Sequence, residues 1–180
     1  MCIRDRCTAW IRLTDHNFFE PYILRGIAQA RMGRINDGLA DLREALRLVP
    51  ANELRDQMII HCTQAMIYIE DGRYLDAMEL ADEAANLQQH DVLPVGLKAV
   101  SAFNQGQTEV AADFFREALT KNRADENQYL HLNYAGFLAM CTNKDFRNAQ
   151  LALEHAEIAL GISGEDSPDA LFIKLSLIHI

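Results

Sequence analysis

Apolar residues recur three and four positions apart along most of this chain, in runs that often end at a glycine or a proline. The stretch 22–50 shows the pattern best, because one run ends at Gly33 and the next ends at Pro50. In the second run the following apolar positions share one helix face: Ile35, Leu39, Leu42, Leu46 and Val49. This spacing predicts two amphipathic helices joined by a turn at Gly33.

The same pattern continues along the chain and predicts an all-α fold. Residues 7–13 have the character of the end of a helix, and Ser167 followed by Pro168 is typical of the start of one. We therefore expect a last helix over 169–174. A longer loop is expected at 141–147, where no tight glycine turn is present. The other helices are expected over residues 21–32, 36–49, 52–71, 74–87, 92–105, 108–121, 129–140 and 148–160.

The helices repeat with a fixed period. Gly106 follows Gly72 by 34 positions, and the same distance separates Ala77 from Ala111 and Ala84 from Ala118. A helix–turn–helix unit of about this length, repeated along a chain, is typical of a solenoid. No single helix pair can bury its apolar face, so each pair is expected to stack on the next.

Small residues recur at matching places in every unit, where two helices of a pair would cross closely. They define three helix positions and a turn. The first helices carry Gly26, Ala65, Ala99 and Ala135. The second helices carry Gly38, Ala77, Ala111 and Ala152, and later Ala45, Ala84, Ala118 and Ala159. The turns carry Gly33, Gly72 and Gly106.

With these positions and this period, the chain resembles the tetratricopeptide (TPR) repeat family over nearly all of residues 7–174. The resemblance implies a right-handed superhelical solenoid of antiparallel helix pairs. It divides the chain into repeats at 19–52, 58–91, 92–125 and 128–161, the last divergent and with an extended turn. It also makes 7–14 the end of a preceding repeat and 167–174 the start of a further one.

The two terminal hexapeptides are related to each other at the nucleotide level. One nucleotide string encodes MCIRDR at 1–6, and its reverse complement encodes LSLIH and begins the last codon of LSLIHI at 175–180. The string resembles the transposon end used in sequencing-library preparation. We therefore interpret both hexapeptides as translated adapter sequence. On this interpretation the chain is a fragment of a longer protein.

Charge and apolar content narrow the class of protein. The net charge is −9 and no basic cluster is present, which argues against nucleic-acid binding. No run of about 18 apolar residues exists, so no membrane span is expected. Cys7, Cys62 and Cys141 are far apart and odd in number, as expected of buried thiols rather than disulfides. They favour a reducing, cytoplasmic compartment.

The sequence shows no pattern of residues that would support catalysis. The histidines His16, His61, His90, His131 and His155 lack metal-ligand spacing, so we expect packed or solvated rings. The carboxylates Asp76, Glu79, Asp82 and Glu83 are expected to form the solvated outer face of a second helix. Since neither a nucleophile elbow nor a phosphate loop is present, we expect no enzyme activity, cofactor or metal in this chain.

In the TPR family the first helices line a concave groove that binds peptides. The resemblance implies these groove positions here: Ile23, Ile27, Arg31, Ile59, Cys62, Met66, Glu70, Leu93, Val100, Asn104, Tyr129 and Leu132. Members that clamp a peptide carboxylate need lysine and asparagine where Ile23, Ile27 and Cys62 stand, so we do not expect that chemistry. Two hypotheses stay open for the apolar positions. They anchor an amphipathic helix or extended peptide, or they are core covered by a neighbouring segment.

These observations favour a protein-interaction scaffold without catalysis, with a protein or peptide partner. The alternative is a regulatory or substrate-recruiting arm of a multidomain enzyme, such as a kinase, whose catalytic domain lies elsewhere. That alternative comes from the fourth unit, residues 137–160, which is similar to a loop-extended variant in long bacterial multidomain TPR proteins. Helical-repeat RNA binding is a third class, which the negative charge disfavours.

Overall fold

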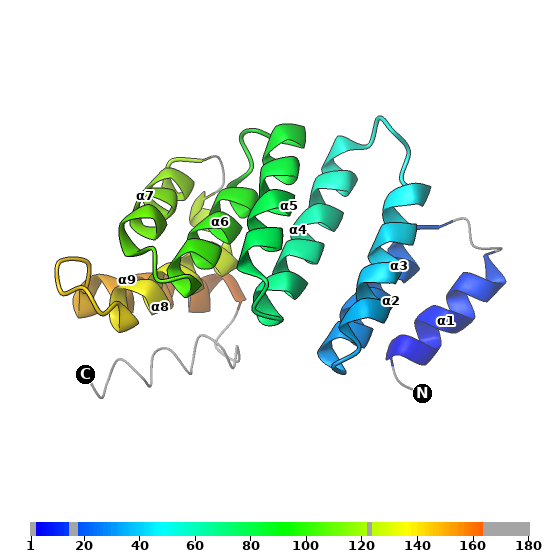
Figure 1. Ribbon diagram of the computed structural model, residues 1–180, viewed down its shortest axis with the longest axis horizontal. Helices are drawn as coiled ribbons and strands as arrows, with labels where there is room; N and C mark the ends of the chain where they lie inside the picture. The colour runs from blue at the N-terminus through cyan, green and yellow to red at the C-terminus, as the bar shows by residue number, and fades with distance from the viewer. Residues whose placement is uncertain (1–2, 15–17, 122–123, 164–180) are drawn as a thin grey trace. The chain divides into compact units, whose positions relative to one another are not determined.

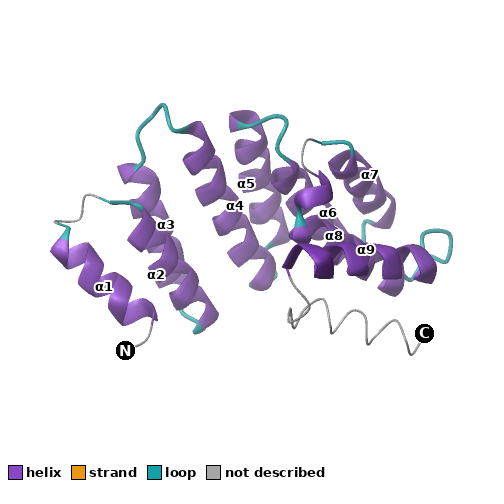
Figure 2. Ribbon diagram, turned by 180° about the vertical axis from the view of Figure 1, so that it is seen from behind, coloured by secondary structure: helices purple, strands orange, loops and turns teal. Residues whose placement is uncertain are grey.

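The computed structural model describes residues 3–14, 18–121 and 124–163, and within these ranges the chain forms helices and loops without a strand (Figures 1 and 2). The all-α prediction is confirmed. The helix expected over 169–174 and the C-terminal hexapeptide lie outside the described residues. The described elements are α1 (Ile3–Leu13), α2 (Glu20–Arg31), α3 (Ile35–Leu48), α4 (Leu54–Glu70), α5 (Tyr74–Leu87), α6 (Val92–Asn104), α7 (Thr108–Leu119), the 3-10 turn η1 (Ala124–Glu126), α8 (Gln128–Met140) and α9 (Ala149–Ser163).

Helices α2 to α9 begin and end within three residues of the predicted positions. Two features differ from the expectation. Helix α1 extends to Ile3 and so includes residues that the nucleotide relationship assigns to an adapter. The short turn η1 between α7 and α8 was not predicted, because three residues are too few for an apolar repeat to appear. No described helix is both long enough and apolar enough to pass through a membrane.

Consecutive helices pack in pairs: α2 with α3, α4 with α5, α6 with α7, and α8 with α9. The chain divides into two compact units, residues 1–89 and 90–180, which we call the N-terminal and C-terminal units. The N-terminal unit contains α1 to α5, and the C-terminal unit contains α6 to α9 and η1. Each unit is described by itself below.

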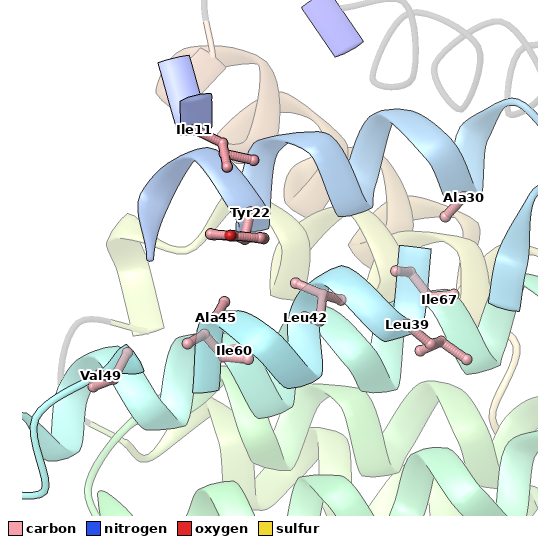
Figure 3. Close-up of a cluster of buried hydrophobic side chains, with 9 residues drawn as sticks. All are labelled: Ile11, Tyr22, Ala30, Leu39, Leu42, Ala45, Val49, Ile60 and Ile67. Atoms are coloured by element: carbon pink, nitrogen blue, oxygen red, sulfur yellow. The ribbon is translucent and has the colours of Figure 1, made fainter. Parts of the chain in front are cut away.

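The core of the N-terminal unit lies between its first four helices (Figure 3). Leu42 of α3 and Ile60 of α4 are completely buried, and burying such a side chain contributes about 1.5–3 kcal/mol. The stability of this unit therefore depends on side chains contributed by several helices. The buried cluster consists of Ile11, Tyr22, Ala30, Leu39, Leu42, Ala45, Val49, Ile60 and Ile67.

The core of the C-terminal unit is aromatic. The rings of Phe115 and Phe137 lie 5.2 Å apart between centroids, and Phe103 meets Phe137 edge-on at the same distance. Phe146, in the loop between α8 and α9, reaches the same cluster at 6.1 Å from Phe137. The predicted extended loop is thus anchored by its own aromatic side chain. Asn148 ends the loop and caps α9, because its Oδ1 accepts from the Leu151 N–H at 3.0 Å.

The three predicted turn glycines share one backbone conformation, with φ of 78° at Gly33, Gly72 and Gly106. Each forms the same pair of bonds. After α4, for example, the N–H of Gly72 donates to the Ile69 carbonyl at 3.1 Å and the N–H of Arg73 donates to the Tyr68 carbonyl at 2.8 Å. This is the Schellman arrangement, which satisfies the last carbonyls of a helix and requires the left-handed region that glycine occupies without strain.

We expect Gly72→Ala to lower the free energy of unfolding by about 1–2 kcal/mol, because a Cβ at this φ meets the backbone of its own residue. No other atom lies within 4 Å of the position that the added Cβ would take, so the cost is purely conformational. Asparagine tolerates the left-handed region better, so Gly72→Asn should cost clearly less than Gly72→Ala. Urea unfolding of the three proteins provides the measurement. Equal losses for the two variants would contradict a backbone origin.

The alanines at the matching repeat positions are all completely buried: Ala45, Ala65, Ala77, Ala84, Ala99, Ala111, Ala118, Ala135, Ala152 and Ala159. In the first pair glycines take two of these positions, and they face each other. A Cβ built on Gly26 would lie 2.8 Å from the Gly38 carbonyl oxygen, and one built on Gly38 would lie 2.6 Å from the Gly26 carbonyl oxygen. The backbones of α2 and α3 therefore approach too closely for any side chain at this point.

The thiols behave as expected. Cys7, Cys62 and Cys141 are all buried and none forms a disulfide within the part of the chain that the structure describes. Each occupies a core position as a small apolar side chain.

Candidate functional site

In the N-terminal unit the candidate groove positions come from α2 and α4, two first helices that contact each other. Ile23, Ile27 and Met66 are half-buried, and Ile59 keeps 36% of its surface exposed. Arg31 and Glu70, at the C-terminal ends of α2 and α4, are exposed. Together the two helices offer partly covered apolar side chains, with one positive and one negative charge at the ends of the helices.

Two of the predicted groove residues do not lie on a surface. Cys62 is 0% exposed and its Sγ lies 3.6 Å from Met58 Sδ inside α4. Val100 is only 7% exposed. Both side chains therefore belong to the core of the helix pairs that contain them. A ligand could touch neither side chain without rearrangement.

In the C-terminal unit the candidate positions come from α6 and α8, which also contact each other. Leu93, Tyr129 and Leu132 are half-buried. Asn104 is exposed, and its side-chain amide donates to the Val100 carbonyl one turn earlier at 2.9 Å. This surface therefore also combines partly covered apolar side chains with a polar end.

The acidic outer face of α5 is solvated, as expected. Glu79, Asp82 and Glu83 are exposed, and Asp76 accepts a hydrogen bond from Arg73 Nε at 2.7 Å. Exposed ion pairs of this kind add little to stability, because water screens the two charges. Among the described residues no group of three or more His, Cys, Asp or Glu side chains could hold a metal ion.

The sequence reasoning missed a polar network at the crossing of α2 and α3. Asp41, only 8% exposed, receives two hydrogen bonds from Arg25, of 2.7 Å from Nε and 2.6 Å from Nη2. Gln29 Nε2 donates a third at 2.8 Å. The hydrogen bonds that Arg25 donates to Asp41 raise the pKa of the Arg25 guanidinium above its ordinary value, so Arg25 stays charged. An arginine that donates two hydrogen bonds to one carboxylate forms one of the strongest hydrogen-bonded contacts in proteins.

The helix positions that hold Arg25 and Asp41 also hold contacting side chains in two other helix pairs. Arg25 stands one residue before Gly26, and Asp41 stands three residues after Gly38. At the matching positions of α6 and α7, Lys98 Nζ lies 4.7 Å from the Phe114 ring centroid. At those of α8 and α9, the Tyr134 and His155 rings meet edge-on at 4.8 Å. The matching positions thus hold an ion pair in α2–α3, a cation–π contact in α6–α7 and an edge-on ring contact in α8–α9. In α4 and α5 the positions hold Gln64 and Leu80.

His61 of α4 is half-buried, and its Nδ1 lies 3.2 Å from the Glu83 carboxylate of α5. Burial lowers the pKa of His61, while the charge of Glu83 opposes this shift. Since Glu83 is 60% exposed, water screens most of the attraction.

A second histidine contact lies between α8 and α9. The Nδ1 atoms of His131 and His155 lie 2.7 Å apart, and the rings stack with centroids 4.9 Å apart. Burial lowers the pKa of both, and for His155 the neighbouring His131 lowers it further. No sequence motif marks this pair, because the two residues are 24 positions apart and meet only through the register of the helices.

Comparisons with known proteins give a fold but no close relative. No protein-family model matches the chain, and no curated protein sequence matches it. The chain is similar in structure to residues 41-end of MamA from Desulfovibrio magneticus RS-1, with a TM-score of 0.57, 16% identity, and coverage of 91% of this chain and 85% of that one.

Two further structures show the same fold. One is the APC/C hetero-tetramer Cut9–Hcn1, with a TM-score of 0.55, 17% identity, and coverage of 97% of this chain and 39% of that one. The other is YrrB, described as a TPR protein with an unusual peptide-binding site, with a TM-score of 0.54, 14% identity, and coverage of 96% and 91%. The fold is therefore a TPR-like helix–turn–helix solenoid.

Proposed function

We propose that this protein is an interaction scaffold that binds a peptide or a helical segment of a protein partner through the apolar face of its first helices. The observation that carries the proposal is the pairing of α2 and α4. Their groove positions hold Ile27, Ile59 and Met66 only partly covered, although all three are large apolar side chains. Several large apolar side chains that stay accessible on two helices in contact are typical of a surface that binds a partner.

The chemistry of the surface suggests the chemistry of its ligand. An amphipathic helix or an extended segment would place apolar anchors against Ile27, Ile59 and Met66. Arg31 and Glu70 would then favour an acidic and a basic residue in the ligand, near the ends of the bound segment. The absence of a lysine and asparagine set at Ile23, Ile27 and Cys62 argues against recognition of a terminal carboxylate. The surface of α6 and α8, with Leu93, Tyr129 and Leu132, extends the proposal to the C-terminal unit.

The fold supports the proposal by analogy. YrrB, which has a similar fold, is described by its peptide-binding site. At 14% identity this similarity concerns architecture, so the assignment to this chain depends on its own residues.

The proposal predicts that replacing Ile59 by a charged residue weakens the binding of a peptide ligand. We would select peptides from a displayed library with the full chain and measure their affinity for wild type, Ile59→Asp and Leu75→Asp. Ile59→Asp is expected to weaken binding about tenfold or more, since a charge would replace an apolar contact. Leu75, on the second helix α5 and 70% exposed, provides the matched control and should leave affinity unchanged.

Three results would contradict the proposal. The first is a failure to select any peptide that competes for one site. The second is an equal loss of affinity in both variants. The third is selected peptides that lack apolar anchors, which would indicate that the apolar positions are not the binding surface.

A further inference from the structure

The His131–His155 pair lies in the contact between α8 and α9. His131 is 1% exposed and His155 is half-buried. The only hydrogen bond between the rings joins the two Nδ1 atoms at 2.7 Å. In the neutral pair one Nδ1–H donates to the other Nδ1, so a single hydrogen holds the contact.

This arrangement can accept protons only at a cost. A first added proton goes to an Nε2 atom and leaves the Nδ1–H···Nδ1 hydrogen bond in place, but it puts a positive charge on a ring that is partly removed from water. A second added proton leaves a hydrogen on both Nδ1 atoms. Two N–H donors then face each other across 2.7 Å, with no acceptor between them. Two like charges in stacked rings would also repel each other. Both effects favour separation of α8 from α9 when the rings are protonated.

The charged and titratable groups around the pair offset this cost only in part. Asp125 of η1 acts on His131, and Glu154 of α9 acts on His155, but both carboxylates are exposed and therefore screened. The Ala124 carbonyl also favours protonated His131. Tyr134 of α8 meets His155 edge-on, and Arg116 of α7 acts on Tyr134. Among the described residues, the hydrogen bond of each ring nitrogen Nδ1 goes to the other ring and not to a carboxylate oxygen.

We propose that the buried His131–His155 contact is an acid-sensitive latch, which holds α8 against α9 at neutral pH and releases the helix pair on acidification. His61 provides the internal contrast, because its Nδ1 faces Glu83 Oε2 at 3.2 Å and not a second imidazole that would become charged with it. The pair α4–α5 should therefore respond less than α8–α9. The inference concerns the stability of one helix pair and is independent of the proposed ligand.

The pH range follows from the pKa values. Burial holds the pKa of both rings below that of an unfolded histidine, which is about 6.5. The opened state therefore binds more protons, and the closed state is favoured fully above about pH 6.5 and progressively less below it. For each ring that stays neutral in the closed helix pair, the equilibrium constant for closing falls about tenfold per pH unit below about pH 6.5.

The experiment is hydrogen exchange of the full chain by mass spectrometry, corrected for the intrinsic rate at each pH. Between about pH 7.5 and about pH 5.5 we expect the protection factors of α8 and α9 to fall about ten- to a hundredfold, and those of α4 and α5 to fall less. The double variant His131→Phe/His155→Phe replaces both rings by apolar ones and should remove the difference between the helix pairs. His90→Gln, which changes an exposed histidine of the same unit, should retain it.

The titration of the two imidazoles by NMR in the wild-type chain gives a second test, which does not depend on a variant that folds. Ring signals that titrate below the unfolded value, together with loss of protection in α8 and α9, would support the latch. Rings that titrate at or above the unfolded value while α8 and α9 stay protected would overturn it. So would a loss of protection that is equal in all helices, or that persists in a folded double variant.

Discussion

Asp41→Ala is expected to lower the free energy of unfolding by about 3 kcal/mol, because it leaves the Arg25 guanidinium without its partner in a largely buried position. The side chains of Arg25 and Asp41 keep only 20% and 10% of their surface, so water cannot fully replace the lost carboxylate. Gln29 loses its acceptor as well, since its amide donates to the same carboxylate. Urea unfolding monitored by circular dichroism measures the loss.

The control for Asp41 is an ion pair on the surface of the same helix. Glu44 and Arg47 lie 2.6 Å apart, but their side chains are 36% and 67% exposed. Glu44→Ala should therefore cost clearly less than Asp41→Ala. If Asp41→Ala cost no more than Glu44→Ala, the buried network would have no special role. The double variant Arg25→Leu/Asp41→Leu should recover most of the loss, because it removes both charges and not one.

The sequence predicted the helices, their turns and the small residues at their crossings, because each depends on a local rule. Amphipathic spacing sets the helices, and a glycine sets each turn by its φ of 78°. The burial of Asp41 was missed, although a signal was present. Asp41 follows Gly38 by three positions and precedes Ala45 by four, so helical periodicity places it on the face that packs against α2.

The same periodicity places His155 three positions after Ala152, on the packed face of α9. Its contact with Tyr134 could thus have been inferred by analogy with Arg25 and Asp41. The contact with His131 could not, because it depends on how far α9 is shifted along α8. The extended loop between these helices, which ends at Asn148, removes the tight glycine turn that fixes this register in the other units.

The exposure of the groove positions is the property that the sequence predicts least well. A family pattern gives a residue's place along a helix, but a rotation of the helix by a fraction of a turn decides between surface and core. Ile59 and Cys62 are three positions apart on α4, yet one is 36% exposed and the other is fully buried. Packing of α4 on its neighbours sets this rotation, and that packing depends on side chains from several helices at once.

Gly38→Ala is expected to lower the free energy of unfolding by about 1–3 kcal/mol, although alanine is the better helix former. The new Cβ would lie 2.6 Å from the Gly26 carbonyl oxygen and 3.2 Å from the Ala30 Cβ and N atoms. Both are parts of α2 that no side-chain rotation can move, so the helices must separate. Separation would also loosen the Arg25–Asp41 contact, which spans the same crossing.

Gly96→Ala provides the matched control for Gly38→Ala. Gly96 also lies within a helix and is buried, but the nearest atom to its added Cβ is Leu130 Cδ1 at 3.9 Å, an ordinary contact. This variant should therefore be neutral or gain up to about 1 kcal/mol from helix propensity alone. Chemical unfolding of both variants separates the two effects, because propensity acts equally at the two sites and only the steric term differs. A stabilised Gly38→Ala would show that α2 and α3 can move apart without loss, and would remove the reason for paired glycines at this crossing.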